Sequence, residues 1–147
     1  MNSFAQFAPR ASAPEARSGS ALGAVVGGVA ILLRLEGLAV FAAALAAYSH
    51  LRASWLAFAA LFLLPDLAMA AYLLGPRLGA SVYNLAHNTV APLALGVAGL
   101  ALGASLAEAL ALVWIAHIGF DRALGFGLKY ASGFGDSHLG RVGRAAS

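Results

Sequence analysis

The chain has 147 residues, of which 61% are hydrophobic and only 10% are charged, and its mean hydropathy is +0.83. A water-soluble domain carries about 25% charged residues, so this composition excludes a soluble protein and predicts an integral membrane protein. The absence of cysteine excludes disulfides, thiolate metal sites and cysteine nucleophiles. The net charge of +3 is small, and the basic residues lie near the predicted helix ends. This pattern is typical of residues that set the orientation of a protein in the membrane, and not of a nucleic-acid-binding surface.

The predicted elements follow one another along the chain as a tail, four membrane helices and a second tail. Residues 1–20 are rich in Ala, Ser and Pro and are predicted to be a disordered cytoplasmic tail. The breaker sequence Gly75-Pro76-Arg77 ends the second helix. Residues 21–128 are predicted to form an all-α, four-helix membrane bundle, and residues 129–147 a cytoplasmic C-terminal tail. Its helices are apolar segments of about 20 residues, the length that spans a bilayer, at residues 22–48, 55–74, 78–102 and 106–124.

The basic residues outside these segments fall unevenly on the two sides of the predicted bundle. Only Arg52 lies on one side. Because cytoplasmic loops are enriched in Lys and Arg, we expect the other side, which contains both termini, to face the cytoplasm. The residues on that side are Arg10, Arg17, Arg77, Arg122, Lys129, Arg141 and Arg144.

Polar side chains inside the apolar segments are costly in a bilayer, so each is a candidate site residue. At a rise of 1.5 Å per residue, those of all four segments lie about 10–20 Å from the cytoplasmic helix ends, which predicts one polar layer in the cytoplasmic half. His117 and Asp121 are one helical turn apart and face the same way. The residues of this layer are Arg34, Glu36, Asp66, Asn84, His87, His117 and Asp121.

Two imidazoles and several carboxylates form a ligand set suited to zinc, manganese or iron. We predict a divalent metal ion, with zinc favoured, held by Asp66, His87, His117 and Asp121. A carboxylate that does not bind the metal, Glu36 or Asp66, is the candidate general base, and we favour Glu36. Asn84 or Arg34 is the predicted stabiliser of an oxyanion or a phosphate. In the tail, Asp136 and His138 are further candidates that could fold over the cytoplasmic mouth.

Two other interpretations of the polar layer stay open. In the first, the protein is not an enzyme, and the polar side chains hold the helices together by hydrogen bonds. In the second, the layer is a relay in a transporter of protons or metal ions, although the outer halves of the segments are almost wholly Ala, Leu and Val. The GxxxG spacing of Gly23 and Gly27, and of Gly99 and Gly103, fits either a homo-oligomer interface or packing within the chain, and we favour packing.

The segments LRLEGLAV, LLPDLAMAAYLLGPRLGASVYNLAHN, AHIGFDRALGFGLKY and DSHLGRVGR resemble the bacterial membrane family called domain of unknown function 4260. This resemblance covers residues 34–144 and implies a location in the bacterial cytoplasmic (inner) membrane.

More distantly, LLPD, LAHNT and AHIGFD are similar to the LPD, THS-like and HxxxD motifs of membrane-bound metal-dependent hydrolases, in the same order. That resemblance implies hydrolysis of a membrane lipid or a lipid-linked substrate. The hydrolase pattern has a second histidine in its middle motif, where this sequence has Tyr83 and Asn84.

Overall fold

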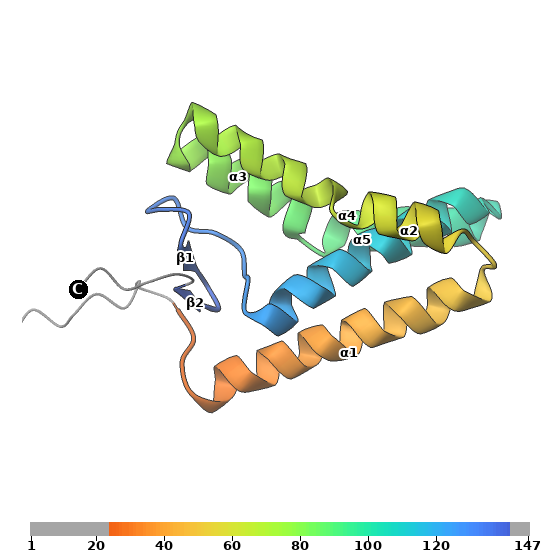
Figure 1. Ribbon diagram of the computed structural model, residues 1–147, viewed down its shortest axis with the longest axis horizontal. Coiled ribbons are helices and arrows are strands. Elements are labelled where there is room, and N and C mark those ends of the chain that lie inside the picture. The colour runs from red at the N-terminus through yellow and green to blue at the C-terminus, as the bar shows by residue number, and fades with distance from the viewer. Residues whose placement is uncertain (1–23, 142–147) are drawn as a thin grey trace, which may run out of the picture.

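The chain forms a helical protein with a short β-hairpin at its C-terminal end (Figure 1). The computed structural model describes residues 24–141. In this part of the chain, three segments are long and apolar enough to cross a membrane: residues 28–50, 55–74 and 76–102. The elements are α1 (Gly28–His50), α2 (Trp55–Phe62), the 3-10 helix η1 (Leu64–Leu74), α3 (Pro76–His87), α4 (Val90–Leu102), α5 (Ser105–Leu124), β1 (Asp136–Ser137) and β2 (Gly140–Arg141).

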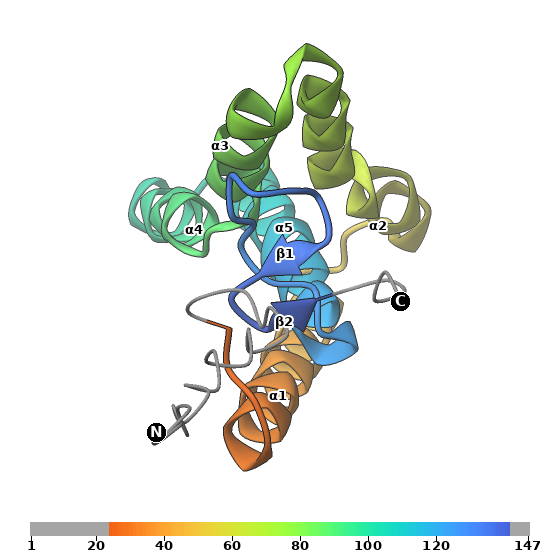
Figure 2. The same cartoon turned by 90° about the vertical axis from the view of Figure 1, so that its left-hand side faces the viewer.

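The fourth predicted membrane segment, α5, is the helix that the others surround. It differs from the three apolar segments because it carries three charged residues, Glu108, Asp121 and Arg122. Helices α1, α2 and α4 all pack against it, whereas η1 packs mainly on α3. Figure 2 shows α5 in the middle, with α1 below it and α2 and α4 on either side. The observed arrangement is therefore a central helix with neighbours on several sides.

Two glycines allow α1 and α5 to approach closely. A Cβ atom on Gly37 would lie only 2.7 Å from Arg122 Cβ, and one on Gly119 only 2.7 Å from the backbone nitrogen of Phe41. Farther toward the other end of the molecule, side chains of α1, α2 and α5 form an apolar core, which consists of Ala44, Tyr48, Phe58, Val113 and Ala116.

Two of the apolar segments change their helical geometry part-way. The second segment is an α-helix up to Phe62 and a 3-10 helix from Leu64, with Pro65 in the first turn of η1. The third is divided into α3 and α4 at Asn88. The Asn88 side-chain oxygen accepts from the N–H groups of Val90 and Ala91, and its amide donates to carbonyls of the last turn of α3. One side chain thus satisfies backbone groups on both sides of the break.

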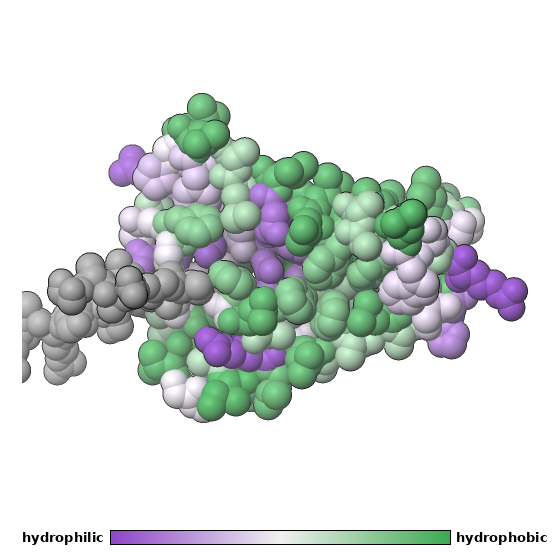
Figure 3. All heavy atoms as spheres, viewed as in Figure 1, coloured by the Kyte–Doolittle hydropathy of each residue, from purple (hydrophilic) through white to green (hydrophobic). Residues whose placement is uncertain are grey.

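The outer faces of the helices are apolar, as Figure 3 shows for one side of the molecule. Residues 129–141, which the sequence places in a tail, fold back against the helices at the left end in Figure 1. The strands β1 and β2 pair antiparallel, and Lys129 forms an isolated bridge with Ser137. The predicted tail at residues 1–20, Gly23 of the first GxxxG pair, and residues 142–147 of the predicted C-terminal tail lie outside the described residues. Gly99 packs against Glu108 of the same chain, and the homo-oligomer stays a prediction.

Candidate metal centre

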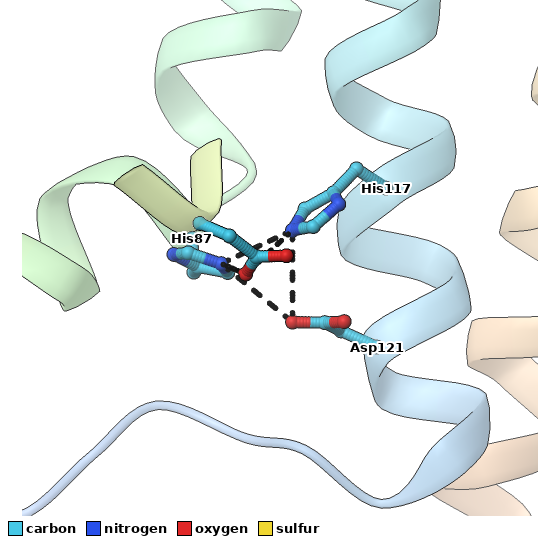
Figure 4. Close-up of side chains that lie close together, drawn as sticks. His87, His117 and Asp121 are labelled. Carbon is cyan, nitrogen blue, oxygen red and sulfur yellow. Dashed lines mark hydrogen bonds and ion pairs between the residues drawn. The ribbon is translucent and has the colours of Figure 1, made fainter. Parts of the chain in front are cut away.

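Two histidines and two aspartates from three separate elements converge on one point. His87 Nε2 lies 3.2 Å from His117 Nε2. Asp66 Oδ1 lies 3.4 and 3.5 Å from these two nitrogens, and Asp121 Oδ2 lies 3.6 and 3.7 Å from them. All four ligand atoms lie within 4.8 Å of one another. Figure 4 shows His87, His117 and Asp121 pointing toward a common centre.

Helix geometry explains how these residues meet. Asp66 lies in the first turn of η1, and His87 is the last residue of α3. His117 and Asp121 are one turn apart on α5 and therefore face the same side. The histidine side chains are 4% and 1% exposed, whereas Asp66 is 29% exposed, so the cluster opens toward solvent or lipid on the η1 side. In Figure 3, hydrophilic atoms are visible in a recess between α3 and α5.

Tyr83 holds two members of the cluster in place. Its carbonyl accepts a hydrogen bond from His87 Nδ1 at 2.9 Å, so the proton of this ring lies on Nδ1 and the Nε2 lone pair faces the other ligand atoms. Its ring stacks on the His87 ring with 3.7 Å between centroids, and its hydroxyl donates to Asp121 Oδ2 at 3.2 Å. The indole of Trp114 donates to the Ala86 carbonyl at 2.6 Å and so ties the end of α3 to α5.

A buried lysine lies beside the cluster. The Asn84 amide accepts from the backbone N–H of Lys129 at 2.7 Å and donates to its carbonyl at 2.9 Å, which fixes this residue against α3. The Lys129 side chain is only 4% exposed, and its Nζ atom makes no hydrogen bond within residues 24–141. Burial lowers the pKa of Lys129, and the negative charge of Asp121 opposes this shift. The ammonium lies over three aromatic rings, those of Tyr83, Phe126 and Phe134.

The four ligand atoms fit a divalent metal ion by geometry and by charge. Ligands about 2.0–2.1 Å from a tetrahedral zinc lie about 3.3–3.4 Å from each other, close to the 3.2–3.7 Å that separate the ligand atoms in five of the six pairs. Two neutral imidazoles and two carboxylates carry a charge of −2, which one divalent cation neutralises. His117 Nδ1 is buried without a hydrogen-bond partner among the described residues. The polar side chains therefore do not fully satisfy one another, as they would if they only held the helices together.

The structure does not bring Glu36 or Arg34 to this cluster. Helix α1 contacts α5 at Gly119, which is two residues from His117 and therefore on nearly the opposite side of α5. Glu36 lines a cavity between α1 and α5, and the Arg34 guanidinium lies against Gly125 at the end of α5.

Asn84 lies one turn before His87 on α3 without joining the cluster, and Asp136 and His138 lie in the C-terminal hairpin. Both polar atoms of the Asn84 amide are engaged by the Lys129 backbone. Asp136 Oδ2 accepts from the Ser132 hydroxyl, and His138 Nδ1 accepts from the Leu128 N–H at 2.9 Å. Reasoning from sequence missed the role of Tyr83, although its position one turn before His87 places it on the same helix face.

The model of a protein family, Domain of unknown function (DUF4260), matches residues 30–142, and the chain belongs to this family. Neither the curated proteins nor the solved structures contain a significant match to the chain. The similarity to membrane-bound hydrolases therefore stays a hypothesis that rests on the three short motifs alone.

Proposed function

We propose that this family member is a metal-dependent hydrolase of the bacterial cytoplasmic membrane that acts on a lipid or a lipid-linked substrate. The observation that carries the proposal is the convergence of Asp66, His87, His117 and Asp121 at spacings that suit one divalent metal ion, with zinc favoured. A divalent ion held by these four ligands would act as a Lewis acid towards an oxygen that enters as a fifth ligand, and it would lower the pKa of a water bound there.

The side chains around the cluster support distinct roles in hydrolysis. Asp66 is the more exposed carboxylate, and its Oδ1 atom faces the histidines. Its other oxygen, Oδ2, is left to accept a proton from an attacking water, the task that the sequence suggested for Glu36. Asp121 is held by the Tyr83 hydroxyl, so it serves as a fixed ligand. The Lys129 ammonium supplies positive charge for an anionic reaction centre.

The position of the site supports a substrate that arrives from the membrane. The outer faces of η1 and α3 carry exposed apolar side chains, among them Leu67, Leu73 and Leu85. Asp66 lies on η1 and is partly exposed, so a lipid beside this helix can present a polar group to the cluster. The lipid then needs no route from the cytoplasm, and only the water that the hydrolysis consumes must reach the cluster.

Metal analysis of the purified protein tests the ligand set. We expect about one metal ion per chain by elemental mass spectrometry after purification in detergent without chelator. His117→Ala and Asp66→Ala should lose the metal, whereas His50→Ala, which changes an exposed histidine at the far end of α1, should keep it. Each variant is checked for folding by circular dichroism and gel filtration. Metal-free wild-type protein, or metal retained in both cluster variants, contradicts the site.

A separate assay tests the reaction. Metal-loaded protein is incubated with total membrane lipid extract, and the products are followed by lipid mass spectrometry. We expect lipid species that lose an ester- or phosphate-linked group in the wild type but not in Asp66→Asn. Metal at one ion per chain without any such product would mean that the centre is structural and that the hydrolase proposal is wrong.

The proposed orientation places both termini in the cytoplasm. It is supported by the excess of Lys and Arg at that end of the molecule. Because the chain lacks cysteine, single cysteines at Ser54 and Ser132, which lie at opposite ends of the helices, can report the orientation in intact cells. An impermeant maleimide should label Ser54→Cys and not Ser132→Cys, and the reverse pattern would contradict the orientation.

A further inference from the structure

A second polar site lies on the other side of α5 from the candidate metal centre. Between α1, α5 and the C-terminal hairpin there is a cavity of about 200 Å³. This volume is far above the roughly 10–15 Å³ that one water molecule needs, so the cavity can hold a group of several heavy atoms. Its apolar walls include Leu33, Val40 and Ile118, and its polar side chains are Glu36, Arg122 and His138.

The two charged side chains of this cavity are not used by the protein itself. Within residues 24–141, neither Glu36 nor Arg122 makes an ion pair or a hydrogen bond. A carboxylate and a guanidinium that line one cavity without pairing leave both charges open to a ligand. At the end of an apolar helix such charges are costly unless they meet a partner.

In the neutral His138 side chain, the backbone contact of one ring nitrogen leaves the other nitrogen as a hydrogen-bond donor. His138 Nδ1 accepts from the backbone N–H of Leu128 at 2.9 Å. The proton of the neutral ring is therefore on Nε2, which makes no hydrogen bond to the described residues. Burial lowers the pKa of His138, and the positive charge of Arg122 acts in the same direction, so the ring stays neutral near pH 7.

These groups together match a ligand that carries both charges. The Arg122 guanidinium and His138 Nε2–H are donors for a phosphate, and the Glu36 carboxylate is an acceptor for an ammonium N–H. The three side chains have a net charge of zero, so an anion alone would leave Glu36 unpaired. A cation alone would leave Arg122 unpaired.

The location selects the source of such a ligand. Arg122 lies two residues from the end of α5 and His138 lies in the C-terminal hairpin, so the donors for a phosphate are at the helix end where headgroups meet the protein. Glu36 lies deeper, eight residues or about 12 Å from the start of α1. The neighbouring surface of α1 is apolar, with Leu32 and Leu35 exposed. In Figure 3, hydrophilic side chains lie over the part of α1 near this end of α5. We propose that the Glu36–Arg122–His138 cavity binds the zwitterionic headgroup of a phospholipid with a primary amine, phosphatidylethanolamine.

Competitive lipid binding tests the proposal. The full chain in detergent is mixed with equal amounts of phosphatidylethanolamine and phosphatidylglycerol with the same acyl chains, and bound lipid is counted by native mass spectrometry. We expect the wild type to retain phosphatidylethanolamine preferentially. Glu36→Gln should reduce the ratio of the two bound lipids at least tenfold, because it removes a charge-assisted hydrogen bond. Arg122→Gln should weaken the binding of both lipids.

Matched controls separate this site from general lipid contact and from the metal centre. Glu108→Gln makes the same chemical change near the other end of α5 and should leave the lipid ratio unchanged. His117→Ala should also leave it unchanged, so failure of the metal proposal does not affect this test. An unchanged ratio in Glu36→Gln, or equal retention of both lipids by the wild type, overturns the proposal. Tighter binding of free glycerophosphoethanolamine than of the whole phospholipid overturns the assignment to a lipid and indicates a soluble ligand.

Discussion

The Tyr83 hydroxyl is the group whose removal tests the metal centre most selectively. Replacing Tyr83 with Phe deletes the hydrogen bond to Asp121 Oδ2. It preserves the ring that stacks on His87 and the backbone carbonyl that orients the His87 ring. All four proposed ligands are kept, so any change in metal affinity comes from the loss of the hydrogen bond between the Tyr83 hydroxyl and Asp121.

The structure sets the size of the expected effect. Losing an outer hydrogen bond to a ligand commonly weakens metal binding 10–100-fold, which corresponds to about 1.4–2.7 kcal/mol. The bond here is 3.2 Å long, beyond the roughly 2.5–3.0 Å of a strong O–H···O contact. We therefore expect Tyr83→Phe to weaken zinc binding about tenfold.

Titration against a chromophoric zinc chelator in detergent measures this change. Tyr48→Phe is the matched control, since its hydroxyl donates to the Ser54 carbonyl at 2.9 Å, at the other end of the molecule. An affinity of Tyr83→Phe within twofold of the wild type, or an equal loss in Tyr48→Phe, would refute the reasoning.

Three further predictions concern packing, the folded C-terminal segment and pH. Gly37→Ala places a Cβ 2.7 Å from α5, so it should lower the free energy of unfolding by about 1–3 kcal/mol. Gly28→Ala is the control, because a Cβ there would meet no atom within 4 Å and should cost nothing. Thermal unfolding in detergent compares the two variants, and equal melting temperatures would contradict the α1–α5 contact. Asn84→Ala removes two hydrogen bonds to the backbone of Lys129, so a protease should cleave residues 125–141 faster than in Gly28→Ala. An unchanged cleavage rate would show that these two hydrogen bonds do not hold the segment in place. Folding lowers the pKa of His138. As the pH falls below about 6.5, the unfolded chain therefore binds a proton at this residue before the folded chain does, so the free energy of unfolding should decrease below that pH. His138→Asn should have a smaller difference in melting temperature between pH 7.5 and pH 5.5 than the wild type, and an equal difference would assign the pH dependence to other groups.

Much of the helical organisation follows from sequence pattern alone. The apolar segments were predictable because their length and composition are those of membrane helices. The break at Gly75 was predictable because proline follows it, and Gly75 has a φ of 119°. The break at Asn88 was not, because its side chain forms caps that replace helical hydrogen bonds without any change in hydropathy.

The sequence predicted how far along each helix the site residues lie, but only partly which way their side chains point. Counting residues along each helix gives the depth of a side chain, and the four proposed ligands do meet at one depth. The same counting placed Glu36 in this layer, yet it gives no information about which side of α5 the first helix covers. That side is decided by the close contact of Gly37 with α5, which depends on the tertiary packing.

The 3-10 geometry of η1 affects how far its carboxylate can reach. A 3-10 helix rises about 2.0 Å per residue, and an α-helix about 1.5 Å. Over the eight residues from Asp66 to Leu74, the same sequence is therefore about 4 Å shorter as an α-helix. This difference exceeds the 3.4 and 3.5 Å between Asp66 Oδ1 and the two histidine nitrogens. A change of helix type in this one segment is thus long enough to extend or withdraw the fourth ligand, while the other three stay on α3 and α5.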